Sequence, residues 1–279
     1  RVTPRHPHGG NFITKTALTV SSSLLYDYDR RMEIDLITRQ TIERLLAAVE
    51  SRDLRAIRTV LHADVTWQNV PHPPAEGREA VVGLLANILC WSDKVQWDVV
   101  SASVSGLTGW YERLDRFWLD GEEYAVPCNG VLTVDLGTQS IVAMRDYNDL
   151  GEWRSRVTSK LVSLAARPAA EVVARHLKAV RTLDPVAMAA DYALSATLER
   201  PGARYRDWYA IADYFASVPE RLAGRQLIFG EVEATGPDAA QVAWEMTGDT
   251  GSAVSGRDFF RVNEGRIFHQ VTTLDEGDF

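Results

Sequence analysis

The chain has 279 residues, of which 46% are hydrophobic, 24% charged and 9% aromatic. This length is large for one small domain and fits two, each with its own core. The formal net charge of −8 argues against nucleic acid or an anionic membrane surface as the main partner, because both attract basic surfaces.

The cysteines and the apolar runs narrow the class of protein further. Cys90 and Cys128 are too few for a metal cluster or a disulfide framework, and no Cys-His spacing resembles a zinc site. No apolar run approaches the roughly 18 residues that a membrane span needs. We therefore expect no metal, no cofactor, no membrane partner and a cytoplasmic location, with small neutral molecules as the best-fitting substrates.

The first 32 residues are predicted to be a flexible leader. They combine basic residues with a weak apolar patch at Ala17 to Leu25, which threonine and serine residues interrupt. A signal peptide needs a more continuous apolar stretch, so that interpretation is disfavoured. An alternative is that the segment lies upstream of a natural start at Met32.

The next part of the chain, residues 33–160, is predicted to be an α+β domain. Apolar residues at helical spacing from Ile42 predict two helices, and a strand with Val65, Trp67 and Asn69 on one face follows. After a third helix, turns at Asp120-Gly121 and Leu136-Gly137 separate long strands. These strands are predicted at Val95–Val104, Thr108–Leu119, Glu122–Val134 and Ser140–Asn148. Helices followed by hairpin strands indicate α+β rather than βαβ architecture.

The same pattern restarts after a linker at residues 161–168. An amphipathic helix with His176 on its apolar side opens residues 169–279, and a helix at Trp208–Val218 and further strands complete a second unit. When the halves are aligned, Trp244 falls near Arg113, Thr272 near Asp146 and Glu199 near Asn69. The second half therefore lacks a carboxylate pair and is predicted to be non-catalytic.

Charged residues interrupt the apolar face of two predicted strands in the first half. At a period of two, Arg113 and Asp115 lie between Tyr111 and Phe117, and Asp146 follows Met144. Ionised groups are seldom buried without partners, because desolvation costs several kcal/mol per ion. We therefore expect these charged groups to lie together in one pocket, where they satisfy one another.

Three segments of the first half resemble the signature segments of the limonene-1,2-epoxide hydrolase family: TWQNVPHPPAEGREAV from Thr66, YERLDRF from Tyr111 and MRDYNDL from Met144. Their order and spacing agree over roughly Ile42 to Trp153. The resemblance implies tandem cone-shaped domains of the nuclear-transport-factor-like superfamily, each a curved mixed sheet wrapped on N-terminal helices around a deep pocket. The second half weakly resembles the SnoaL-like branch, which includes polyketide cyclases of natural-product biosynthesis.

The resemblance also implies residue roles. Asp146 would take a proton from water, Asp115 would give one to the epoxide oxygen, and Arg113 would hold both carboxyl groups. Asn69 matches a water-binding asparagine of the family, but Trp67 stands in place of a tyrosine, and an indole N–H cannot accept a hydrogen bond. The expected pocket residues are Tyr111, Phe117, Met144, Val65 and His72.

The expected activity is hydrolysis of an apolar terpenoid- or polyketide-like epoxide without a cofactor, and two alternatives remain. If Trp67 leaves the water poorly held, a hydroxyl of the substrate could open the epoxide, which would make the protein a cyclase. The third possibility is a non-catalytic protein that binds a small molecule. The sequence does not decide the oligomeric state, although a homodimer or an intramolecular pseudo-dimer of the two halves is expected.

Overall fold

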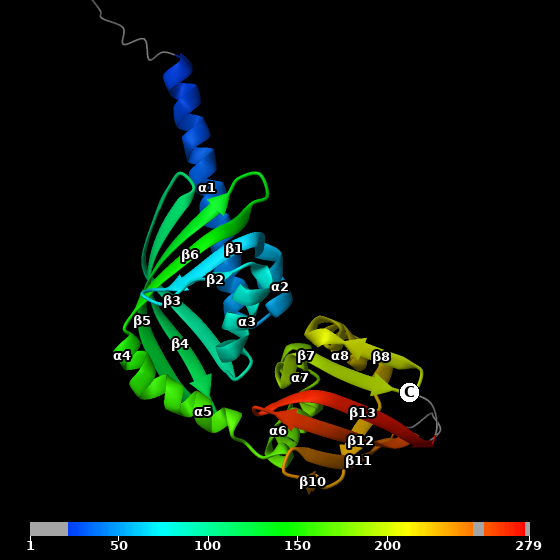
Figure 1. Ribbon diagram of the computed structural model, residues 1–279. Helices are drawn as coiled ribbons and strands as arrows, with labels where there is room; N and C mark the ends of the chain where they lie inside the picture. The colour runs from blue at the N-terminus through cyan, green and yellow to red at the C-terminus, as the bar shows by residue number, and fades with distance from the viewer. Residues whose placement is uncertain (1–21, 248–253, 277–279) are drawn as a thin grey trace, which may run out of the picture.

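The computed structural model describes residues 22–247 and 254–276, which form two consecutive α+β units (Figure 1). In the first, the helices α1 (Ser22–Glu50), α2 (Leu54–Val60) and α3 (Arg78–Leu89) pack against a curved sheet. Its strands are β1 (Leu61–Asn69), β2 (Ala75–Glu76), β3 (Lys94–Ser105), β4 (Thr108–Leu119), β5 (Glu122–Asp135) and β6 (Ser140–Asn148). The four long strands were predicted to within one residue at each end.

The first sheet is mixed, with the strand order β2-β1-β6-β5-β4-β3. β1 runs parallel to β6, and the neighbouring pairs from β3 to β6 are antiparallel hairpins. The two-residue turn at Asp120 and Gly121 joins β4 to β5, and both residues have positive φ values (54° and 76°), which suits a tight hairpin. Inward-facing side chains of this curved sheet can therefore converge on one interior.

A helical segment closes the first unit and leads to the second. It consists of α4 (Leu150–Glu152), the π-helix η1 (Trp153–Thr158) and α5 (Ser159–Ala165). Most of the predicted linker is consequently helical, because α5 extends through residues 161–165. The predicted leader also differs in part: residues 1–21 lie outside the described residues, but residues 22–32 form the start of α1, which projects away from the sheet (Figure 1).

The second unit repeats the architecture of the first. Its sheet has the order β10-β11-β12-β13-β7-β8, and β13 runs parallel to β7 as β6 does to β1. Its helices are α6 (Ala169–Thr182), α7 (Pro185–Ala190) and α8 (Asp207–Leu222). Its strands are β7 (Tyr192–Arg200), β8 (Ala203–Arg206), β9 (Gln226–Phe229), β10 (Glu233–Gly236), β11 (Ala239–Thr247), β12 (Val254–Asn263) and β13 (Arg266–Glu276).

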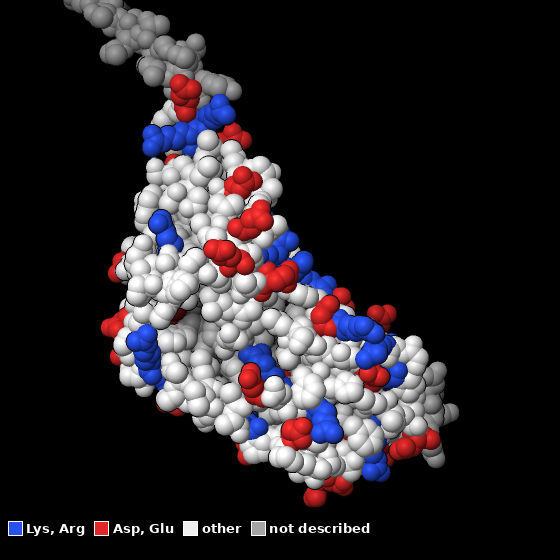
Figure 2. Space-filling model, viewed as in Figure 1, with Lys and Arg blue, Asp and Glu red and all other residues white. Residues whose placement is uncertain are grey.

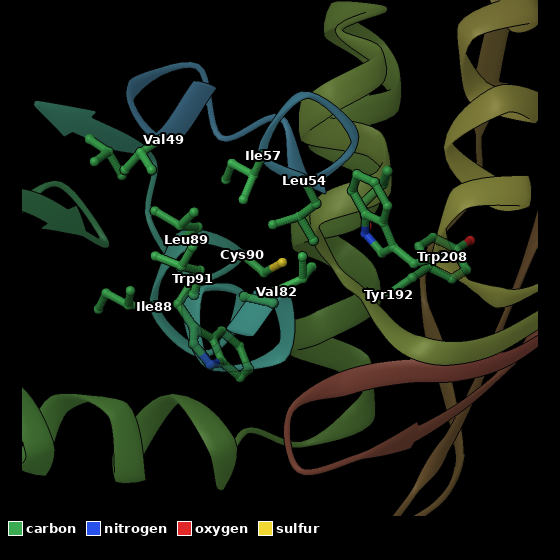
Figure 3. Close-up of a cluster of buried hydrophobic side chains, with 14 of the residues drawn as sticks. Val49, Leu54, Ile57, Val82, Ile88, Leu89, Cys90, Trp91, Tyr192 and Trp208 are labelled. Carbon is green, nitrogen blue, oxygen red and sulfur yellow. The ribbon is translucent and has the colours of Figure 1, made fainter. Parts of the chain in front are cut away.

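The buried apolar side chains of the two units belong to one cluster. Part of this cluster is drawn in Figure 3, where Leu54 and Val82 of the first unit and Tyr192 and Trp208 of the second are labelled. Trp208 is 3% exposed, and its indole N–H donates to the carbonyl of Ala189 at 2.9 Å. The interface between the units is therefore packed like a domain interior. No helix in the described part of the chain is long and apolar enough to cross a membrane.

Candidate active site

Arg113 lies at the centre of the candidate site, between two buried carboxyl groups. Its Nε donates to Asp115 Oδ1 at 3.0 Å and its Nη2 to Asp115 Oδ2 at 3.1 Å, while Nη2 also reaches Asp146 Oδ1 at 3.3 Å. The side chain of Arg113 is fully buried, and those of Asp115 and Asp146 are 9% and 3% exposed. The structure thus brings together the three charged groups that were expected to share one pocket.

The strand register explains this meeting. Arg113 and Asp115 are two residues apart on β4, so both side chains lie on the same face of the sheet. Asp146 on β6 is opposite Gly130 on β5, and Tyr111 on β4 is also opposite Gly130. Because Gly130 has no side chain, the guanidinium group of Arg113 can cross β5 and reach Asp146.

Further groups fix the guanidinium in this place. A Cβ atom at Gly130 would collide with Arg113 Nη1 and stand 3.0 Å from Asp146 Oδ1. Arg113 Nη2 also donates to the sulfur of Cys128 at 3.2 Å, and Cζ lies 4.4 Å from the centroid of the Trp97 ring. Burial raises the pKa of Cys128, so its thiol stays neutral beside the carboxyl groups.

The charge states follow from this environment. Burial opposes the charge of Arg113, but Asp146 and Asp115 outweigh it and raise the pKa of the guanidinium. Burial raises the pKa of Asp115 as well, although the Arg113 charge and hydrogen bonds oppose the rise. A guanidinium beside two ionised carboxylates would bury a net negative charge, and the raised pKa of Asp115 opposes that state.

The carboxyl groups open into an apolar cavity of about 650 Å³. Its walls include Leu84, Leu85, Ile88, Trp97, Phe117, Val126, Trp153 and Leu161. Trp153 of η1 packs edge-on against Phe117 at 6.0 Å between ring centroids. Figure 2 shows the molecular surface hollowed between α3 and the helical segment that follows β6, with mostly uncharged surface around the hollow. A cavity of this size and lining suits a small apolar molecule that is attacked at its polar end.

Trp67 and Asn69 of β1 border the same carboxyl groups. The indole N–H of Trp67 donates to Asp146 Oδ2 at 3.0 Å, so both oxygens of Asp146 accept hydrogen bonds from the protein. Asn69 lines the cavity and accepts from the side-chain amide of Asn148 at 3.4 Å. Both residues therefore lie where the sequence analysis expected them.

Of the five residues expected to line the pocket, Phe117 and His72 do so, whereas Val65, Tyr111 and Met144 do not. These three are at most 3% exposed and belong to the core. They share the inner face of the sheet with Trp67, Arg113 and Asp146, and each precedes one of these residues by two positions along its strand. There α1 fills the interior, since the side chain of Ile42 lies against Gly109 of β4.

Several residues of the cavity were not predicted from the sequence. Trp97, Asn148, Trp153 and Arg154 line it, and Cys128 and Gly130 position Arg113. The position of Cys128 could have been predicted from the hairpin turn, because a two-residue turn at Asp120-Gly121 places Arg113 opposite Cys128. The lining residues after β6 carried no comparable signal. Within the described ranges, no group of three His, Cys, Asp or Glu side chains could hold a metal ion.

The second unit has a different interior. Trp244 pairs with Gly256 across neighbouring strands, as Arg113 pairs with Cys128 in the first unit. Thr272 pairs with Asp258, as Asp146 pairs with Gly130. Glu199 pairs with Val271, one residue before Thr272, so Arg200 rather than Glu199 corresponds to Asn69. The expected position of Glu199 near Asn69 is therefore correct to within one residue.

A buried carboxyl group that the sequence analysis missed also lies in this second unit. Asp258 Oδ1 accepts from the Thr272 hydroxyl at 2.6 Å, and burial raises the pKa of Asp258 to about 6 against the hydrogen bonds from Thr272, Gln270 and Trp244. The cavity beside it measures about 60 Å³, because aromatic side chains such as Phe215 and Trp244 fill the interior. This space is about one tenth of that in the first unit.

Comparison with known proteins agrees with the repeated fold. The family model of the SnoaL-like domain matches residues 42–142 and again residues 173–270, so the chain belongs to this family within the nuclear-transport-factor-like superfamily and contains two tandem copies of its domain. The comparison with curated proteins found no match.

Solved structures resemble one unit at a time. A putative SnoaL-like polyketide cyclase from Jannaschia sp. CCS1 is 17% identical over 45% of this chain and 94% of its own, with a TM-score of 0.41. One from Shewanella denitrificans OS-217 is 14% identical over 44% and 98%, with a TM-score of 0.39. An epoxide hydrolase from M. tuberculosis, described as LEH-like, is 21% identical over 47% and 96%, with a TM-score of 0.38.

Proposed function

We propose that the first unit is an epoxide hydrolase that adds water to an apolar terpenoid- or polyketide-like epoxide. The observation that carries this proposal is Arg113, which binds two carboxyl groups of different environment at the inner end of an apolar cavity. A pocket that only binds apolar molecules gains nothing from buried charges. The match of three separated sequence motifs to epoxide hydrolases favours the same reaction.

The reaction needs one proton acceptor and one proton donor. The Asp146 carboxylate takes a proton from water as the water oxygen bonds to an epoxide carbon, and the C–O bond of the ring breaks. Asp115 gives its proton to the departing oxygen, so the product is a vicinal diol. Exchange of protons with solvent then restores both carboxyl groups. Each positioned proton transfer contributes typically about 10²- to 10⁴-fold to the rate.

The proposal is tested by following product mass in water enriched in oxygen-18 with a panel of terpene and polyketide-like epoxides. The wild type should incorporate the label, and Asp115→Asn and Asp146→Asn should each lose at least about 100-fold in rate. Asp98→Asn is the matched control, because Asp98 also lies on a sheet strand but pairs with Arg116 away from the cavity. No turnover by the wild type on any member of the panel would contradict the proposal.

Intramolecular opening of the epoxide is a second candidate function, which Trp67 favours. The indole N–H of Trp67 donates a hydrogen bond to Asp146 Oδ2. Because an indole N–H is a donor only, Trp67 cannot accept a hydrogen bond from the second proton of an attacking water. A hydroxyl group of the substrate has one proton, which Asp146 takes. With a hydroxy-epoxide as substrate, an isomeric product without oxygen-18 would identify this reaction, and a labelled triol would exclude it.

A further inference from the structure

The residues that line the cavity of the first unit divide by exposure into an interior and a rim. Asp115, Asp146 and most of the apolar wall residues are buried and define the interior. The exposed lining residues are His72, Asn87, Arg154 and Thr158, and all four are polar. A bound molecule would therefore have its reacting end at the carboxyl groups and its other end among hydrogen-bond donors.

Arg154 belongs to the π-helix η1, whose geometry aims several side chains at the cavity. In an α-helix, residues i and i+5 point in directions about 140° apart around the helix axis. In a π-helix, residue i+5 lies about one turn after residue i, so the two point to the same side. Trp153 and Thr158 are five residues apart and both line the cavity, with Arg154 beside them. The π-helix thus contributes both the ring of Trp153 and the positive charge of Arg154 to the cavity wall.

The charge of Arg154 has no counterpart within residues 22–247 and 254–276. Among the described residues Arg154 makes no ion pair or hydrogen bond, whereas Arg156 of the same π-helix pairs with Glu152 at 3.0 Å. The carboxyl groups that line the cavity, Asp115 and Asp146, belong to the interior and already bind Arg113. In a chain with a formal net charge of −8, the rim therefore presents an uncompensated positive charge.

We propose that Arg154 binds a carboxylate at the far end of the substrate while the epoxide reaches Asp115 and Asp146. The substrate class is then an amphiphilic epoxy acid: an apolar chain or ring system with an epoxide at one end and a carboxylate at the other. The identity of the reacting group rests on the proposed hydrolase function. The carboxylate contact does not, so the two can be tested separately.

Binding without chemistry tests the contact itself. Quenching of tryptophan fluorescence is a suitable signal, because Trp67, Trp97 and Trp153 line the cavity. The wild type should bind decanoate about three- to tenfold more tightly than decanamide, and Arg154→Gln should lose this preference. Arg156→Gln is the matched control and should keep it. Salt should weaken the binding of decanoate by the wild type and leave that of decanamide unchanged.

Three results would overturn the inference: equal binding of acid and amide by the wild type, an unchanged preference in Arg154→Gln, or a wild type that binds neither compound. A turnover measurement then separates this inference from the proposed function. With the epoxide of undecenoic acid and its primary amide, Arg154→Gln should raise KM for the acid alone and leave kcat unchanged. A wild type that binds decanoate but converts no epoxide would refute hydrolysis and leave the carboxylate contact in place.

Discussion

Gly130 shows how one missing side chain shapes the candidate site. It lies opposite Asp146 on β6 and Tyr111 on β4, and the Arg113 guanidinium passes over it. We predict that Gly130→Ala displaces Arg113, because the new Cβ atom would collide with Nη1. The expected result is a loss of about 100-fold or more in turnover with a loss of about 1–3 kcal/mol in stability, which is typical of overpacking.

A matched alanine at a surface turn controls for the general effect of replacing glycine. Gly137→Ala would place its Cβ atom 3.5 Å from Asp135 Oδ1, an ordinary contact, at a position outside the cavity. Turnover and urea denaturation of both variants are the measurements. Equal activity of Gly130→Ala and the wild type would show that Arg113 does not need to cross β5 at this point.

Asp258 of the second unit gives a prediction about pH. Burial raises its pKa to about 6, above the value of about 3.9 for an unfolded aspartate. The native state therefore holds this proton more tightly than the unfolded state. The resulting stabilisation is complete below about pH 4 and is lost as the pH rises to about 6, by about 2–3 kcal/mol.

Asp258→Asn should remove this pH dependence while keeping an acceptor for the Thr272 hydroxyl. We expect the variant to match the wild type at pH 4 and to exceed its free energy of unfolding at pH 7. Asp191 contributes a remaining slope in both proteins, because burial raises its pKa to about 6 as well. Urea denaturation at several pH values is the measurement, and parallel curves for the two proteins would refute the assignment.

At the scale of elements, prediction from sequence worked where periodicity and turn chemistry agree. Burial alternates along β4, β5 and β6, and turns that contain glycine separate β3, β4, β5 and β6. Both the bounds of these strands and the facing of Arg113, Asp115 and Asp146 were therefore predictable. The helical segment after Asn148 begins as α4 and continues as the π-helix η1. Its π-helical turn begins at Trp153, which packs against Phe117 in a tertiary contact that has no signal in the local sequence.

The distinction between core and pocket was also beyond sequence reasoning. Met144 and Asp146 share one face of β6, but Met144 is 1% exposed in the core and Asp146 borders the cavity. The difference arises because the helices fill one end of the curved sheet and leave the other open. Periodicity of a strand gives the face of a residue and not its depth.

The helical segment that carries Trp153 and Arg154 begins at an N-cap that can be tested. The Asp149 carboxylate accepts from the backbone N–H groups of Gly151 at 2.9 Å and Glu152 at 3.1 Å. We predict that Asp149→Ala costs about 1 kcal/mol of stability and weakens ligand binding in the cavity. The reason is that the helical segment with Trp153 and Arg154 loses its N-cap. Thermal denaturation and ligand titration are the measurements.

Asp184 provides the matched control for this cap. It caps α7 in the second unit in the same way, accepting from the N–H groups of Val186 and Ala187 at 3.0 and 3.2 Å. Asp184→Ala should lose a similar amount of stability without an effect on ligand binding in the first unit. If both variants weakened binding equally, the effect would come from general destabilisation rather than from the cavity wall.

At the scale of the whole molecule, the second unit contacts α3, the helix of the first unit that forms part of the cavity wall. Arg266 at the start of β13 donates to the carbonyl of Ala86 in α3 at 2.9 Å, and its guanidinium lies 4.7 Å from the Trp91 ring centroid. The adjacent Gly265 has a φ of +65°, and a Cβ atom there would meet Trp91. The other side of α3 supplies Leu84, Leu85 and Ile88 to the cavity wall. The second unit can therefore support the site without catalytic residues of its own.

We predict that Arg266→Ala loosens α3 and widens the cavity. The lost hydrogen bond from a charged donor is worth about 1.5–3 kcal/mol and the cation–π contact about 0.5–1 kcal/mol. Amide hydrogen exchange in α3 should accelerate, and apolar ligands should bind more weakly, while exchange in β5 stays unchanged. Arg261→Ala is the control, because Arg261 lies in the same hairpin but pairs with Asp238 within the second unit. Unchanged exchange in α3 of Arg266→Ala would mean that the first unit holds its cavity wall by itself, and the repeat would then need another explanation.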